Sequence, residues 1–221
     1  LIIGLVAASA LLHVAWNVRL KTAFDPLRAA TIGMLAGTLA IVPVGFGLWL
    51  VSGSPALPAE GVALGLASGV FEAAYFILLA EAYRRGDLSI VYPLARGTAP
   101  LLLVAVGVVV LDERLGPAGW VGVGCLLAGF LALQRPWQVV TARSGGRRPD
   151  AAIAFAIATG VMIAGYTSLD RVGTRLIAPF TYAAILWVSG AFLLALWVRF
   201  VAGGRLWAGG PDQNRRAAVG G

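Results

Sequence analysis

Apolar residues run along this chain in seven long blocks, each separated from the next by polar or turn-forming residues. An α-helix rises about 1.5 Å per residue, so about twenty apolar residues cross the hydrocarbon core of a bilayer. The pattern therefore predicts an all-α integral membrane protein, a multi-span helical bundle of about seven spans. The predicted spans are residues 1–19, 29–51, 61–83, 88–111, 117–134, 151–170 and 179–201.

The connections between the blocks are short and carry turn or charge signals. Asp25-Pro26 ends the first connection, and Arg84-Arg85-Gly86-Asp87 makes a very short third one. Residues 135–150 form the longest internal loop, which is rich in Arg and Gly. None of these connections is long enough to fold as a separate soluble domain. Whatever this protein does, it does within the bilayer.

Composition supports the membrane class and narrows the chemistry. The chain is 59% hydrophobic and 12% charged, about half of the roughly 25% charged residues usual in soluble domains. With one cysteine and one histidine in the chain, neither a disulfide framework nor a cysteine-based zinc site is available. We therefore expect no metal, no other cofactor and no enzymatic activity.

The net charge of +7 lies almost entirely in the connections, which indicates membrane topology and not nucleic-acid binding. Thirteen of the 17 basic residues fall on one predicted side, three on the other and Arg96 within a span. Because basic loops stay in the cytoplasm, this count places the N-terminus outside. The thirteen are Arg19, Lys21, Arg28, Arg84, Arg85, Arg135, Arg143, Arg147, Arg148, Arg199, Arg205, Arg215 and Arg216.

A few ionisable residues lie inside predicted spans, where a charge costs a few kcal/mol, so they are the best indicators of a site. Glu72 and Arg96 lie roughly 16 Å and 12 Å from the short turn that joins their spans. They are therefore close enough in depth to form an ion pair, and His13 lies on the same side at about 9 Å. Such a pair serves substrate or proton coupling, or merely fixes how the helices pack.

Two further acidic residues lie nearer the span ends. Glu81 follows Glu72 by nine residues, on nearly the opposite face and close to a loop, so we expect an interfacial role. Asp170 ends the sixth predicted span, and we expect it at the far interface, beside Arg171 or Arg175.

Aromatic and polar residues accompany the interior charges. His13, Trp16 and Asn17 share one helix face, and Tyr75 lies one turn from Glu72. Tyr92 precedes Arg96 by four residues, also about one turn. Tryptophan and tyrosine often mark only the membrane interface, but these accompany interior charges and are candidates to line a cavity.

The fourth predicted span holds residues that disturb a helix. Pro93, Gly97 and Pro100 fall within eight positions, and each proline removes a backbone hydrogen bond. Irregular backbone persists in a membrane where it is buried or lines a polar cavity, as in the broken helices of transporters. We therefore predict a bend here, with a packing kink as the simpler alternative.

A faint internal repeat relates the first and sixth spans. Trp16-Asn17 aligns with Tyr166-Thr167 at an offset of 150 residues, and Lys21 then aligns with Arg171. Five spans separate the two segments, so a second repeat would insert with inverted orientation, a common plan for transporters.

Several motifs resemble those of EamA-type proteins of the drug/metabolite transporter superfamily. Leu11 to Asn17 with Lys21 resembles the family's opening, and Ala82 to Pro100 resembles its third-to-fourth-span region. Leu111 to Leu115 resembles the end of its fourth span, with Asp112 in place of the usual glycine, and Gly165 to Asp170 resembles the start of its second repeat.

The resemblance implies ten spans in two five-span repeats. Residues 1–134 would then form the first repeat, 135–150 a basic loop, and 151–221 an incomplete second repeat of about two spans with a polar tail, so we expect further spans beyond Gly221. The family arrangement places both termini in the cytoplasm, whereas the charge count places the N-terminus outside. The orientation therefore stays open.

We predict a secondary active transporter that exports amino acids or related small metabolites across the bacterial plasma (inner) membrane by alternating access. The lipid bilayer and a small-molecule substrate are its expected partners, protons are the candidate coupling ion, and the oligomeric state is left open. The alternative is a non-transporting membrane protein: a lipid-modifying enzyme built on Asp112-Glu113, a receptor or a scaffold. The predicted substrate-binding residues are His13, Trp16, Asn17, Glu72, Tyr75, Tyr92, Arg96 and Tyr166, and the predicted helix-bend residues are Pro93, Gly97 and Pro100.

Overall fold

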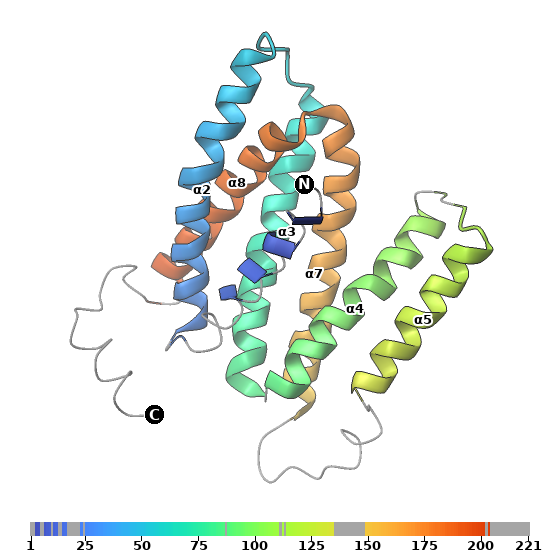
Figure 1. The fold of residues 1–221 in the computed structure, drawn as a ribbon. Helices are drawn as coiled ribbons and strands as arrows, with labels where there is room; N and C mark the ends of the chain where they lie inside the picture. Colours follow the sequence, from blue (N-terminus) through green and yellow to red (C-terminus); the bar gives the residue numbers. More distant parts are fainter. Residues whose placement is uncertain are drawn as a thin grey trace.

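The computed structural model describes most of the predicted spans, and the regular structure in the described residues is helical (Figure 1). The first predicted span is described only in short pieces. The described residues are 3–4, 7–9, 11–12, 15–16, 23, 25–86, 88–110, 112, 114–134, 149–201 and 203.

Six helices cover the predicted spans from the second onward, which confirms the all-α membrane fold. Five of them are long and apolar enough to cross a membrane, and α5 holds a shorter apolar helix at Pro117–Gly129. The helices are α2 (Pro26–Val51), α3 (Ala59–Arg85), α4 (Leu88–Val109), α5 (Pro117–Gln134), α7 (Pro149–Leu176) and α8 (Pro179–Phe200).

Local chemistry explains where α2 begins, three residues before the predicted start. The Asp25 side chain accepts hydrogen bonds from the backbone N–H groups of Leu27 and Arg28, at 3.1 Å and 3.3 Å. Pro26 occupies the first helical position, where its missing N–H costs nothing. The Asp25-Pro26 pair is therefore the start signal of α2 as well as the end of the loop.

The start of α2 and the end of α3 lie on the same side of the bundle. Arg84 reaches Asp25 at 3.7 Å and Glu81 at 2.8 Å, and Arg85 also forms an ion pair with Glu81. These groups are partly exposed at the end of α3. The structure therefore agrees with the interfacial position expected of Glu81.

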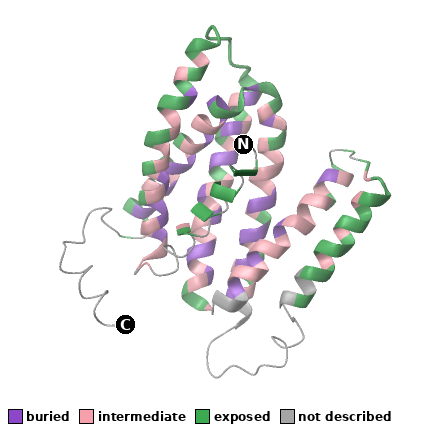
Figure 2. Cartoon of the chain, viewed as in Figure 1, coloured by how far each residue is buried: buried purple, intermediate pink, exposed green. Residues whose placement is uncertain are grey.

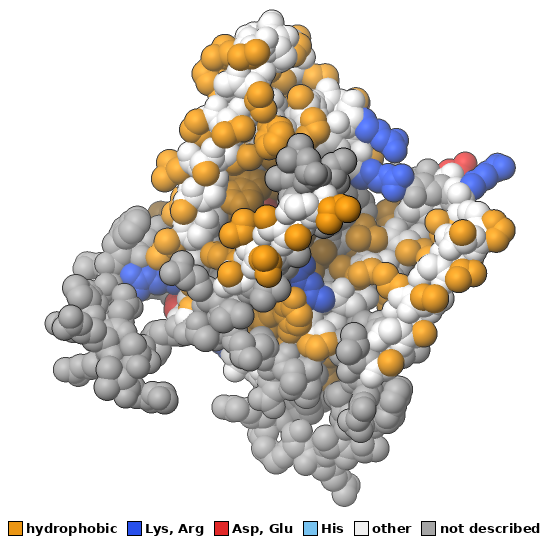
Figure 3. All heavy atoms as spheres, in the orientation of Figure 1, with side chains coloured by type: hydrophobic (Ala, Val, Ile, Leu, Met, Phe, Trp, Pro, Cys, Tyr) orange, Lys and Arg blue, Asp and Glu red, His pale blue; other side chains and the backbone are white. Residues whose placement is uncertain are grey.

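Helix α3 is the centre of the bundle. It packs along α7 and against α8, while α2 packs on α8 and α4 packs on α7 (Figure 1). Helix α5 contacts chiefly α4 and lies to one side. Figure 2 shows buried residues along α3, α7 and α8, whereas α5 is mostly exposed. Apolar side chains spread over the outward faces in Figure 3, as expected of a surface that lipid covers.

Helix α4 continues through its two prolines. Pro93, Gly97 and Pro100 all lie inside the single helix Leu88–Val109. The bend predicted at these residues therefore does not end the helix, and their role as a bend stays a prediction.

Candidate functional site

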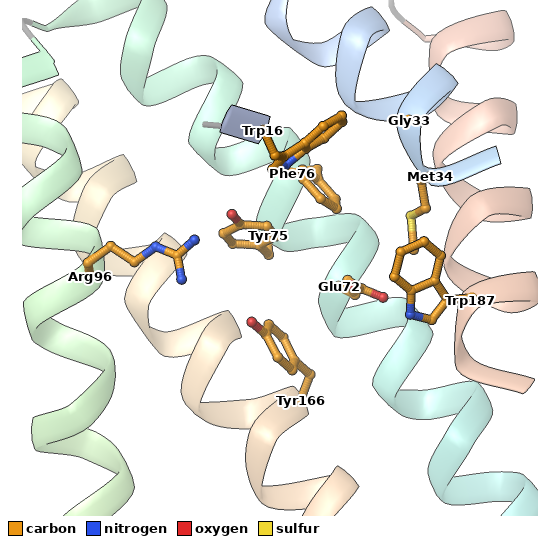
Figure 4. A pocket seen from close by; sticks show the side chains of 9 residues that line it. All are labelled: Trp16, Gly33, Met34, Glu72, Tyr75, Phe76, Arg96, Tyr166 and Trp187. Atoms are coloured by element: carbon orange, nitrogen blue, oxygen red, sulfur yellow. The ribbon is translucent and has the colours of Figure 1, made fainter. Parts of the chain in front are cut away.

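A cavity of about 290 Å³ lies among α2, α3, α4, α7, α8 and Trp16, at the middle of the bundle (Figure 4). It combines one carboxyl group and one guanidinium group with five aromatic rings. Its lining residues are Trp16, Gly33, Met34, Glu72, Tyr75, Phe76, Arg96, Tyr166 and Trp187.

The two charged side chains lie at opposite ends of the cavity. Figure 4 shows Arg96 on one side and Glu72 on the other, with the rings of Tyr75 and Tyr166 between them. The Arg96 guanidinium carbon is 5.8 Å from the centre of the Tyr92 ring. The ion pairs among the described residues do not include one between Glu72 and Arg96. The direct ion pair that the sequence suggested is therefore wrong, because aromatic rings separate the two groups.

Glu72 presents an unsatisfied acceptor to this space. Its Oε2 atom is buried, and within the described part of the chain it has no hydrogen-bond partner. A buried carboxyl oxygen without a donor is costly, and in a native site it calls for a ligand, a proton or a water. Glu72 Oε2 is therefore the atom in this cavity at which a hydrogen-bond donor of a ligand is expected to bind.

Aromatic rings make up much of the cavity lining. Tyr75 contacts Phe76 with ring centres 4.6 Å apart, and Tyr166 meets Tyr75 edge-on at 6.2 Å. Two tryptophans close the side next to α2, where glycines leave room for them. A Cβ atom at Gly37 would overlap the Trp187 ring, and one at Gly33 would overlap the Trp16 ring. At both glycines the nearest atoms are therefore those of an indole ring.

The structure brings together most of the described candidate residues. Trp16, Glu72, Tyr75, Arg96 and Tyr166 all line the cavity. Tyr92 lies beside Arg96 but is not among the lining residues. His13 and Asn17 lie outside the described residues.

Sequence reasoning missed four lining residues: Gly33, Met34, Phe76 and Trp187. Trp187 carried a usable signal, because it lies eight residues after Pro179, at a depth of about 12 Å and well inside the span. A tryptophan at that depth is not an interfacial anchor. The other three resemble lipid-facing residues in sequence and had no comparable signal.

The position predicted for Asp170 is wrong. Helix α7 continues past it to Leu176, and its carboxylate turns to neighbouring helices. Ser68 Oγ on α3 donates to Asp170 Oδ1 at 2.5 Å, and Tyr182 Oη on α8 donates to the same oxygen at 3.1 Å. Both donors come from neighbouring helices, and the sequence suggested neither of them.

Comparison with known proteins identifies the family. The model of the EamA-like transporter family matches residues 1–134. Relatives include the spermidine export protein MdtI of Salmonella paratyphi B, Salmonella newport and Salmonella heidelberg. Each is 41% identical over 61 residues, which is 28% of this chain and 56% of the relative.

The chain thus spans about half the length of the curated relatives it matches. No solved structure matches it. The family match covers more than half of the chain, and the apolar helices agree with a membrane protein. This chain is an integral membrane protein that belongs to the EamA-like transporter family.

Proposed function

We propose that this protein is a secondary active transporter that exports amino acids or related small metabolites across the bacterial cytoplasmic membrane by alternating access. Protons are the coupling ion. The observation that carries the proposal is the cavity between Glu72 and Arg96, which is lined by aromatic rings and lies among helices long enough to span a bilayer.

The cavity has the chemistry of a zwitterion site. Arg96 suits a substrate carboxylate, because a guanidinium donates two parallel hydrogen bonds to a carboxylate. Glu72 at the other end suits a substrate ammonium, which would supply the donor that its Oε2 lacks. Tyr75, Tyr166 and Trp187 can hold the apolar part between them and contribute cation–π attraction. The volume of about 290 Å³ is at the small end of ligand pockets, which suits a small metabolite.

The packing supports alternating access between two repeats. We propose that residues 1–134 form the first five-span repeat, as the family match over the same residues suggests, and that residues 151–221 belong to the second. Helices α2, α3 and α4 of the first unit pack against α7 and α8 of the second, so the cavity lies at their interface. Trp16 and Tyr166, equivalent under the 150-residue offset, both line it. Substrate sites at repeat interfaces are typical of transporters that rock one repeat against the other.

The curated relatives are named as exporters of spermidine. Glu72 and the rings would attract the ammonium groups of such a polyamine, but Arg96 in the same cavity would repel them. We therefore propose a zwitterion as the preferred substrate, with polyamines as the competing class.

The test uses the purified protein in proteoliposomes loaded with a mixed pool of amino acids, polyamines and other small metabolites. Mass spectrometry follows what leaves, with and without a pH gradient. We expect selective loss of zwitterionic amino acids, faster with the gradient. No selective loss, from protein shown to be folded, would overturn the proposal in favour of a scaffold, receptor or lipid-modifying enzyme.

Matched variants connect the transport to the cavity. Glu72→Gln and Arg96→Gln each remove one charge from the site, and we expect each to lower transport about 30-fold or more. Glu60→Gln and Arg114→Gln make the same changes at exposed positions and should leave transport unchanged. Full transport with unchanged pH dependence in Glu72→Gln would remove Glu72 from the mechanism.

A further inference from the structure

A second polar cluster lies next to the cavity and joins three helices at one carboxylate. Asp170 on α7 accepts from Ser68 on α3 and from Tyr182 on α8, both at the same oxygen. Ser68 is fully buried and Tyr182 is 1% exposed. The ion pairs found among the described residues do not include Asp170. Neutral hydroxyls from two helices therefore stabilise this carboxylate.

Close backbone approach holds the Tyr182 ring in place. At Gly173, one turn after Asp170, a Cβ atom would lie within 2.8 Å of the Tyr182 hydroxyl. At Gly65, one turn before Ser68, it would lie 3.5 Å from the ring. The ring thus lies between α3 and α7 because both helices carry glycine where it passes. The packing of the ring therefore directs its hydroxyl toward Asp170.

The cluster is electrostatically linked to the cavity. Ser68 and Glu72 are one turn apart on the same face of α3. Asp170 follows Tyr166 by one turn on α7, and Glu72 and Tyr166 both line the cavity. Arg171 and Arg175 follow on α7 with exposed side chains. Two negative charges this close inside a membrane are costly, so a proton on one carboxyl group favours the negative charge on the other.

We propose that Asp170 is the residue that takes up the driving proton, and that its Ser68 and Tyr182 hydrogen bonds are the clamp which that proton releases. This inference rests on the proposed transport function. When Asp170 is charged, two charge-assisted hydrogen bonds tie α3, α7 and α8 together. When Asp170 binds a proton, both bonds lose their charge assistance, which roughly halves their strength. The units on either side of the cavity can then move apart.

A proton suits this position better than a metal ion. The described residues contain no group of three or more His, Cys, Asp or Glu side chains that could hold a metal. Asp170 Oδ1 already accepts two hydroxyl donors, so only the other carboxylate oxygen is left to bind a cation. A requirement for sodium in place of a pH gradient would therefore contradict the proposal.

The test separates net transport from exchange in proteoliposomes, using the amino acid released by the wild-type protein. Substrate-for-substrate exchange needs the binding site but no net proton movement. We expect Asp170→Asn to lose the stimulation by a pH gradient while its exchange rate stays within about twofold of wild type. Glu72→Gln should lose both activities. An Asp170→Asn variant that keeps the gradient response, or that folds but loses exchange as well, would overturn the proposal.

Three further variants guard against misfolding and non-specific effects. Asp112→Asn changes an exposed carboxylate outside the bundle and should behave as wild type. Ser68→Ala and Tyr182→Phe keep Asp170 but remove one donor each. Because each donor stabilises the charged carboxylate, we expect the half-maximal pH of gradient-driven transport to rise by about one unit. An unchanged pH profile in both variants would contradict the clamp even if Asp170→Asn does not fold.

A readout without transport completes the test. Membrane-soluble carbodiimides react with protonated carboxyl groups, and peptide mass spectrometry identifies the modified residue. We expect modification of Asp170 to rise as pH falls, and to be stronger in Ser68→Ala at a given pH. Labelling of Asp170 that does not depend on pH would contradict the proposal. A wild-type protein that transports nothing overturns the proposed function, whereas transport with a retained gradient response in Asp170→Asn overturns the proton role alone.

Discussion

Helices α3 and α5 carry similar patterns of apolar residues and spaced glycines, yet the structure uses them in opposite ways. On α3, a Cβ atom at Gly69 would lie 2.7 Å from the Leu186 carbonyl oxygen and 2.8 Å from the Gly190 nitrogen of α8. On α5, the same atom at Gly122 or Gly124 would meet nothing within 4 Å. Glycine spacing alone therefore does not identify a packed face.

Polar residues make the difference between the two helices. Helix α3 carries Ser68, Glu72 and Tyr75 on the sides that face α7, α8 and the cavity. Helix α5 has no charged residue between Pro117 and Gln134, and none of its described side chains is buried. Inside a membrane a polar group must find a partner, so it selects the face that packs. Small residues then determine how closely that face can approach its neighbour.

The largest effect expected from this comparison follows from adding one methyl group to each helix. Gly69→Ala places a Cβ against backbone atoms of α8 that cannot rotate away, so the helices must separate. We expect a loss of about 3 kcal/mol in stability, measured by thermal unfolding in detergent. Gly122→Ala should change stability by less than about 1 kcal/mol, in the stabilising direction, because alanine favours a helix over glycine. A clear destabilisation by Gly122→Ala would show that another surface covers α5 in the assembled protein.

The fold was largely predictable because helices that cross a bilayer need about twenty apolar residues, a signal local in sequence. The helix ends were less predictable. The sixth span was expected to stop at Asp170, but the helix runs to Leu176. Ser68, which offsets the cost of that carboxylate, is 102 residues away in sequence. No local pattern reveals such a partner.

The site residues, too, divide into those that the sequence could identify and those that it could not. Glu72, Tyr75, Arg96 and Tyr166 were identifiable because polar and charged groups are rare inside spans. Met34 and Phe76 were not, since an apolar residue facing a cavity looks like one facing lipid. The separation of Glu72 from Arg96 was also beyond sequence reasoning. Depth along the helix is readable from residue number, but the rings inserted between the two side chains depend on how three helices are rotated.

A second, smaller contrast comes from two tryptophans. Trp187 is half-buried, packs against Gly37 and lines the cavity, whereas Trp120 on α5 is 54% exposed. We expect Trp187→Ala to cost about 2 kcal/mol, less than for a fully buried tryptophan because part of its ring faces the cavity. Trp120→Ala should cost less than about 0.5 kcal/mol. Thermal unfolding of both variants measures the difference, and equal losses would contradict the assignment of α5 to the lipid-facing side.

A third contrast compares two small polar side chains. Ser68 on α3 is fully buried and donates to Asp170, while Cys125 on α5 is exposed. Ser68→Ala should lower stability by about 1 kcal/mol, because hydrogen bonds between membrane helices contribute modestly. Cys125→Ala should leave stability within about 0.5 kcal/mol of wild type. The two unfolding curves can be compared directly. A larger loss of stability in the cysteine variant would contradict the conclusion that α3 is the packed helix and α5 the exposed one.

The smallest perturbation is to label Cys125, the single cysteine, because this leaves the sequence of α5 unchanged. A small fluorophore attached to Cys125 should be quenched by lipids with brominated acyl chains, because the described structure leaves this face of α5 uncovered. The matched control moves the cysteine to the buried face of α3, as Ser68→Cys with Cys125→Ser, where we expect little labelling. Efficient quenching at Cys125 with unchanged thermal stability would identify α5 as a lipid-facing helix. Protection from the brominated lipids would instead show that this face of α5 is an interface, and Gly122→Ala should then be destabilising as well.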